Sequence, residues 1–123
     1  PSYLKYLEQT EPRVRVILNA TNRGFSAANN QGLAVATGSR LVILNNDTVV
    51  PPGWLTRLLR HLDDPTVGLV GPRTNAVSNE ARLEGDYETW GEMEDFAARE
   101  TWKLDGQIAD IAMLAMYCVA IRK

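Results

Sequence analysis

The chain has 123 residues, 45% of them hydrophobic and 23% charged, which indicates one small globular domain and excludes a disordered or fibrous protein. A formal net charge of −2, without clustered Lys or Arg residues, gives no support for a nucleic-acid partner. No apolar run approaches the roughly 20 residues that span a bilayer, so we expect no transmembrane segment in this chain.

The first third of the chain predicts two helices and a strand. Ser2 can cap a short helix that Pro12 ends, and the alternation of polar and apolar residues over positions 13–18 predicts a strand. Ser26 is expected to cap a second helix, which Gly38 stops.

The middle of the chain predicts two strands on either side of a helix. The continuous apolar run at residues 41–44 is typical of a central parallel strand that is covered on both faces. Pro51, Pro52 and Gly53 are expected to open a helix, and residues 67–70 to form a short strand. The inner face of that helix is expected to hold Trp54, Leu55, Leu58, Leu59 and Leu62.

The last third predicts an exposed loop at residues 74–85, a helix at 92–102 and a final strand at 113–121. The single cysteine, Cys118, lies in this apolar strand, and we expect a buried, unreactive thiol. The repeated alternation of strand and helix predicts an α/β fold: an open, mostly parallel, Rossmann-like sheet with helices on both faces.

Two polar segments are expected at the rim of this sheet, where such folds bind ligands. Asp47 directly follows the apolar strand at 41–44, so its carboxylate would be presented there with little freedom. Mg²⁺ and Mn²⁺ favour such oxygen ligands together with ligand phosphates. Taken alone, however, the pattern favours a structural role for Asp47, as a cap on the helix near Pro52 or in an Asx turn with Asn45.

The other segment, residues 22–30, lies between a predicted strand and a predicted helix. Its backbone N–H groups could bind an anion, and the amides of Asn22, Asn29 and Asn30 could contact a base or ribose. It lacks the glycine spacing of a dinucleotide fingerprint and the lysine of a P-loop. The simpler interpretation is a glycine-assisted turn with a capping serine and solvated asparagines.

An ordered set of motifs runs through the chain: Asn22-x-Gly24-Phe25-x-x-Ala28-x-Asn30-x-Gly32, Ala36-x-Gly38, Leu44-Asn45-Asn46-Asp47-Thr48 and Pro52-Gly53-Trp54-Leu55, followed by Gly68-Leu69-Val70-Gly71-Pro72, Thr74-Asn75 and Cys118-Val119-Ala120-Ile121-Arg122. Together they resemble the family-2 glycosyltransferases, in particular a bacterial, rhamnosyltransferase-like branch. The resemblance covers nearly the whole chain, and the ordered set is far more specific than any single motif.

The resemblance implies a GT-A fold of the nucleotide-diphospho-sugar transferase type. It also implies a hexosyltransferase-like enzyme that moves a sugar, with inversion, from a nucleotide-diphosphate sugar to a hydroxyl of a glycan or lipid-linked glycan. Synthesis of a bacterial polysaccharide or cell-envelope glycan is the expected setting, in the cytoplasm or at the inner face of the membrane.

Residues 45–47 match the acidic DxD-type motif of that family. The resemblance therefore implies that Asp47 binds a divalent metal, Mg²⁺ or Mn²⁺, together with the donor diphosphate. Asn45 replaces the first aspartate of the motif, and only donor contact is carried over to it. The expected donor-binding residues are Asn22, Gly24, Phe25, Asn30, Asn45, Asn46 and Asp47.

Two parts of the family pattern have no counterpart here: a first strand whose aspartate reads the nucleotide, and an acidic general base after the strand that holds Cys118. Residues 1–123 are thus expected to be a partial domain, with an unknown catalytic base beyond Lys123 and little activity alone. The exposed sheet edge that results would favour self-association. Glu100, Asp105 and Asp110 are expected to be solvated charges.

Four other side chains are candidates for the site or the core. Trp54 and Trp102 are expected in the core, His61 as a partly exposed helix residue, and Trp90 as the one aromatic candidate for contact with the acceptor. Two further functions stay open: a nucleotide-sugar-binding or structural module without catalysis, and an unrelated α/β nucleotide enzyme. The missing glycine fingerprint and phosphate-loop lysine argue against the latter.

Overall fold

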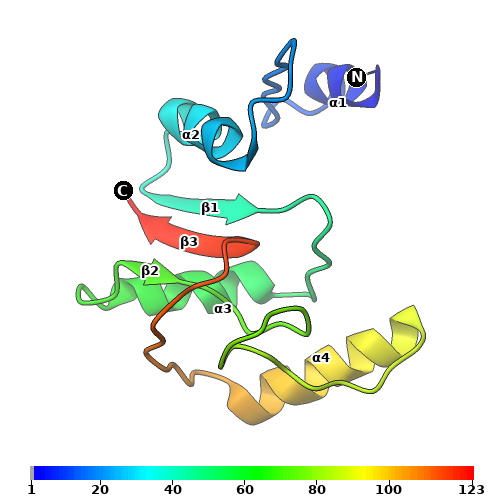
Figure 1. Ribbon diagram of the computed structural model, residues 1–123, viewed down its shortest axis with the longest axis vertical. Coiled ribbons are helices and arrows are strands. Elements are labelled where there is room, and N and C mark those ends of the chain that lie inside the picture. Colours follow the sequence, from blue (N-terminus) through cyan, green and yellow to red (C-terminus); the bar gives the residue numbers. More distant parts are fainter. Residues whose placement is uncertain (1) are drawn as a thin grey trace. The chain divides into compact units, whose positions relative to one another are not determined.

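The computed structural model describes residues 2–123, which divide into two compact units, one ending at Thr37 and one running from Gly38 to Lys123. The first unit contains the helices α1 (Ser2–Thr10) and α2 (Phe25–Val35). The second contains, in chain order, β1 (Arg40–Leu44), α3 (Trp54–Arg60), the 3₁₀ helix η1 (His61–Asp63), β2 (Leu69–Val70), α4 (Trp90–Leu104) and β3 (Cys118–Arg122) (Figure 1). No helix within residues 2–123 is both long and apolar enough to cross a membrane.

In the first unit both predicted helices form, but the strand predicted at residues 13–18 is wrong. This segment is irregular, and its backbone is held locally instead of in a ladder. The Val14 N–H donates to the Glu11 carbonyl at 2.9 Å, and the Val16 N–H donates to the Glu8 carboxylate at 2.7 Å. A turn and a side chain of α1 therefore accept the backbone hydrogen bonds that a neighbouring strand would accept if this segment were part of a sheet.

The second unit is built on a three-stranded sheet in the order β1-β3-β2 (Figure 1). β3 is antiparallel to β1, with Leu44 opposite Cys118, and antiparallel to β2, with Val70 opposite Ala120. The α/β class is confirmed, whereas the mostly parallel sheet is wrong, because both ladders of this sheet are antiparallel. The strand at residues 40–44 is also an edge strand instead of the expected central one, since β3 returns after α4 and enters between β1 and β2.

One face of this sheet is covered by α3 and η1. Leu58 and Leu62 pack there against Val70, Cys118 and Ala120, and Leu62 is only 1% exposed. Apolar burial of this kind contributes about 25 cal/mol per Å² and supplies most of the free energy that holds the unit together. Burial also raises the pKa of the Cys118 thiol, as expected for an unreactive cysteine.

The prediction of helices on both faces is not met within this unit, where α3 and η1 are the helical segments that pack on the strands. α4 lies apart from the sheet (Figure 1). The inner-face prediction for α3 holds for Trp54, Leu58 and Leu59 but not for Leu55, which is 40% exposed.

Two arginines, Arg40 of the edge strand β1 and Arg122 of the central strand β3, tie η1 to the sheet. The Arg122 guanidinium donates to the carbonyl oxygens of Leu62 and Asp64, the latter at 2.7 Å, and Arg40 pairs with the Asp63 carboxylate. The main-chain carbonyls at the end of η1 are thus satisfied by a strand side chain.

α4 is longer than predicted, because a capping box starts it two residues earlier. The Thr89 hydroxyl accepts from the Glu92 N–H, and the Glu92 carboxylate accepts from the Thr89 N–H in return. On this helix Trp90 is exposed, and Trp102 is 87% exposed, so the expectation that Trp102 lies in the core is wrong. The apolar residues of α4 do recur at helical spacing, but α4 does not pack on the sheet, so this spacing does not place Trp102 in the core.

Candidate functional site

The chain leaves β1 through a tight turn that carries the DxD-like motif. The Asn45 N–H makes a last ladder bond of 2.8 Å to the Tyr117 carbonyl, and the Thr48 N–H then donates to the Asn45 carbonyl at 3.2 Å. Asp47 is the third residue of this four-residue turn. Because Tyr117, directly before β3, holds Asn45, the turn starts from a defined position after β1.

The Asp47 carboxylate is exposed, and within residues 2–123 it has no hydrogen-bond or ion-pair partner. The N-cap of α3 is Gly53, which receives no side-chain bond, so the alternative of Asp47 as a helix cap is wrong. The Asx turn with Asn45 does not form among the described residues either. Asp47 thus fills neither of these two structural roles, and its oxygens are available to a ligand.

The other predicted segment, in the first unit, is a glycine-assisted turn. The Asn22 side-chain oxygen accepts from the Gly24 N–H at 2.8 Å, and Gly24 has a φ of 78°, a conformation that favours glycine. α2 begins directly after it, so Gly24 and not Ser26 is the N-cap. Phe25 and Asn30 are exposed.

The expected donor residues therefore fall into two groups. Asn45, Asn46 and Asp47 share one turn of the second unit, whereas Asn22, Gly24, Phe25 and Asn30 lie at the start of α2 in the first unit. In the first group Asn45 is half-buried, and Asn46 is exposed like Asp47.

The metal ligands that the protein offers at Asp47 fit a metal ion that binds together with ligand phosphates better than a metal ion held by protein side chains alone. Within residues 2–123 no group of three His, Cys, Asp or Glu side chains is placed to hold a metal ion. Magnesium, however, commonly takes one or two carboxylates and completes its shell with water and ligand phosphates. A single free carboxylate at the end of a strand satisfies that requirement.

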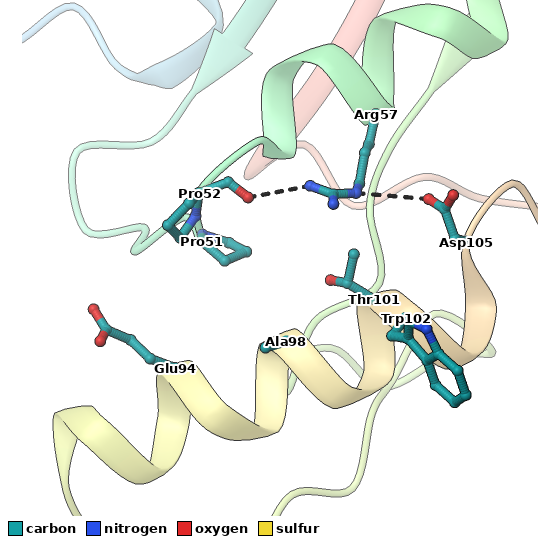
Figure 2. Close-up of a pocket in the computed structure, with 8 residues that line it drawn as sticks. All are labelled: Pro51, Pro52, Arg57, Glu94, Ala98, Thr101, Trp102 and Asp105. Carbon is teal, nitrogen blue, oxygen red and sulfur yellow. Dashed lines mark hydrogen bonds and ion pairs between the residues drawn. The ribbon is translucent and has the colours of Figure 1, made fainter.

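After the turn, the chain is held against the end of α4 by Arg57. Its guanidinium donates to the Pro52 carbonyl at 3.2 Å and lies 3.6 Å from the Asp105 carboxylate (Figure 2). Gly53, with a φ of 76°, makes room for this contact, because a Cβ there would clash with a guanidinium nitrogen of Arg57. A side chain at position 53 would therefore displace Arg57.

Asp105 is not simply the solvated charge that the sequence suggested. Arg60 donates to both of its oxygens, at 2.7 and 3.3 Å, and this hydrogen bonding holds the pKa of the Asp105 carboxyl below its usual range. Glu100 pairs with Lys103 at 3.6 Å, whereas Asp110 is exposed without a partner within residues 2–123. His61 is half-buried in η1, as expected.

A pocket of about 300 Å³ opens between the start of α3 and one face of α4 (Figure 2). It is lined by Pro51, Pro52, Arg57, Glu94, Ala98, Thr101, Trp102 and Asp105. This pocket was not predicted from the sequence. The signal that could have found it is the helical spacing of residues 94, 98, 101, 102 and 105, which puts them on one face of a helix.

Comparison with known proteins identifies the class of this chain. Residues 1–122 match the model of glycosyl transferase family 2, and the chain belongs to that family. Membership implies the GT-A fold, and enzymes of this family typically use a divalent metal, a sugar donor and an acceptor.

Among curated proteins, the chain is similar to a pre-mycofactocin glycosyltransferase of Mycobacterium tuberculosis, with 34% identity over 87 residues, which are 71% of this chain and 18% of that protein. It is also similar to the succinoglycan biosynthesis protein ExoO of Rhizobium meliloti, with 32% identity over 72 residues, 58% of this chain and 21% of that protein. The chain thus spans about a fifth of the length of these two relatives. No solved structure matches it.

The pairing of Asp105 with Arg60 predicts a pH-dependent contribution to stability. A carboxyl whose folded-state pKa is lowered stabilises the fold above its unfolded pKa of about 3.9, and this stabilisation is lost as the pH falls through the folded pKa. Asp105→Asn should therefore lower the melting temperature at pH 7, and the difference from wild type should disappear in acid. Thermal denaturation against pH measures this. Asp110→Asn is the control, and an equal loss in both variants would refute a specific role of Asp105.

Proposed function

We propose that this chain forms the nucleotide-sugar-binding part of an inverting, metal-dependent glycosyltransferase of bacterial polysaccharide or cell-envelope glycan synthesis. Family membership supports the reaction class, and the ExoO relative, named for succinoglycan biosynthesis, supports the setting. The finer placement in a rhamnosyltransferase-like branch rests on the ordered motifs from Asn22 to Leu55.

The observation that carries the proposal is the free carboxylate of Asp47 at the end of β1. In a nucleotide-sugar complex, Asp47 would hold Mg²⁺ or Mn²⁺ beside the donor diphosphate, and the metal would neutralise charge on the departing group. Asn45 and Asn46 would contact the donor from the same turn. Asn22, Gly24, Phe25 and Asn30 would provide the second contact, with backbone N–H groups at the start of α2 directed to polar groups of the nucleotide.

We also propose that residues 1–123 are a partial domain, and that the base that deprotonates the acceptor hydroxyl lies beyond Lys123. The much greater length of the relatives supports this division. On this proposal the chain alone binds the nucleotide-sugar donor but does not transfer the sugar efficiently. The alternative function, a binding module without catalysis, makes the same prediction for the chain alone.

Calorimetric titration tests the donor site. UDP and dTDP are titrated, with and without MnCl₂, against the wild type, Asp47→Asn and the matched variant Asp110→Asn. Even partners of metal ligands typically cost 10- to 100-fold in affinity when changed, so Asp47→Asn should weaken the Mn²⁺-dependent binding by at least about tenfold. Asp110→Asn should leave it unchanged. Binding that is equally tight in Asp47→Asn, with both variants folded by circular dichroism, would contradict the role of Asp47.

The position of β1 at the edge of its sheet supports self-association of the chain. Along a strand of an antiparallel pair, successive backbone N–H groups point alternately toward and away from the neighbouring strand. Because the Asn45 N–H donates to Tyr117, the Leu44 N–H points away from β3. Leu44→Pro removes that donor and should reduce the mass measured by light scattering over a dilution series, whereas the wild type should form dimers or larger species. A wild type that is monomeric at all concentrations would refute this.

A further inference from the structure

We infer that the pocket between the start of α3 and α4 is a subsite for a pyranose ring of the acceptor glycan. This inference rests on the proposed function and adds to it the place and chemistry of the acceptor. Figure 2 shows Glu94, Ala98 and Thr101 on the face of α4 turned toward Pro51 and Pro52, whereas the indole of Trp102, which also lines the pocket, extends from the helix away from the two prolines.

The lining combines the two kinds of surface that a sugar ring needs. Pro51, Pro52 and Ala98 offer apolar walls for C–H groups, and the indole of Trp102, 87% exposed, is an aromatic surface beside the pocket that is free to stack on a ligand. The Thr101 hydroxyl and the Glu94 carboxylate have no hydrogen-bond partner within residues 2–123. A mostly apolar cleft with a few unpaired polar groups is the usual form of a small-molecule site, and about 300 Å³ suits a ligand of monosaccharide size.

The charges of the lining select a neutral polyhydroxyl ligand over a phosphate. Arg57, the one cation of the lining, contacts Asp105 and the Pro52 carbonyl. Asp105 is further neutralised by Arg60, so Glu94 remains as an uncompensated negative charge. A carboxylate repels a phosphate but accepts hydrogen bonds from sugar hydroxyls.

The pocket lies within reach of the candidate metal ligand. Pro51 is four residues after Asp47, and an extended chain spans at most about 3.6 Å per residue, so their Cα atoms are separated by no more than about 14 Å. The Pro51 wall of the pocket is therefore at most about 14 Å, between Cα atoms, from the candidate metal ligand. An acceptor sugar bound at Pro51 and Pro52 would lie beside the donor instead of at a remote surface.

Saccharide titration followed by ¹H–¹⁵N NMR tests the subsite directly. The whole chain is titrated with the methyl glycosides of glucose, galactose, mannose and rhamnose, with glycerol as a control for unspecific polyol effects. At least one glycoside should shift the Trp102 indole N–H and the Thr101 amide saturably, while the Trp90 indole stays fixed. If no glycoside shifts Trp102 more than glycerol does, the inference is wrong.

Matched variants then assign the contacts, with the Thr101 amide as the reporter. Glu94→Gln should weaken glycoside binding about tenfold, the effect of losing a hydrogen bond to a charged group, whereas Asp95→Asn on the same helix should not. Trp102→Ala should weaken it about three- to tenfold through lost stacking, whereas Trp90→Ala should not. Equal effects of each variant and its control would overturn the assignment.

Two further experiments distinguish an acceptor sugar from a donor sugar in the pocket, and distinguish failure of the acceptor subsite from failure of the proposed donor site. Glycoside binding that persists in Asp47→Asn keeps the acceptor subsite even if the donor proposal fails. Conversely, Mn²⁺-dependent UDP binding without any glycoside effect at Trp102 retains the donor site and rejects the subsite. If UDP-glucose displaces the glycoside from Trp102 and UDP does not, the pocket takes the donor sugar, and the acceptor assignment is overturned.

Discussion

The insertion of β3 between β1 and β2 is the constraint on which the second unit depends. Cys118, Val119 and Ala120 are fully buried in this strand, and its neighbours on both sides pair with it in antiparallel register. The residue directly before this strand, Tyr117, supplies the carbonyl that ends the β1 ladder at Asn45. The candidate metal ligand is therefore positioned by the most buried part of the unit, although Asp47 itself is exposed.

A second constraint acts on the segment that follows the turn. Arg57 contacts both the Pro52 carbonyl and Asp105, and Arg60 holds the same carboxylate, so the start of α3 is linked to the end of α4. These are exposed ion pairs, which are individually weak. Their consequence is geometric, because they set the separation of the two pocket walls.

The parts of the fold that follow from local pattern could be predicted from the sequence. The apolar run of β1, the proline-glycine start of α3 and the position of Asp47 after the strand are all read from adjacent residues. Strand direction could not be predicted, because the apolar run of β3 has the same pattern in a parallel or an antiparallel ladder. Its direction depends on the path of the chain after α4. The exposure of Trp102 was missed for a related reason, since helical spacing identifies a face of α4 but not what that face covers.

A donor-linked metal site at Asp47 is tested by paramagnetic broadening of backbone amide signals by Mn²⁺ in the presence of UDP. Signals of residues 45–48 should broaden first, the effect should require UDP, and Asp47→Asn should abolish it while Asp110→Asn should not. Broadening that is centred on other carboxylates, or that is unchanged in Asp47→Asn, would contradict a donor-linked metal site at the end of β1.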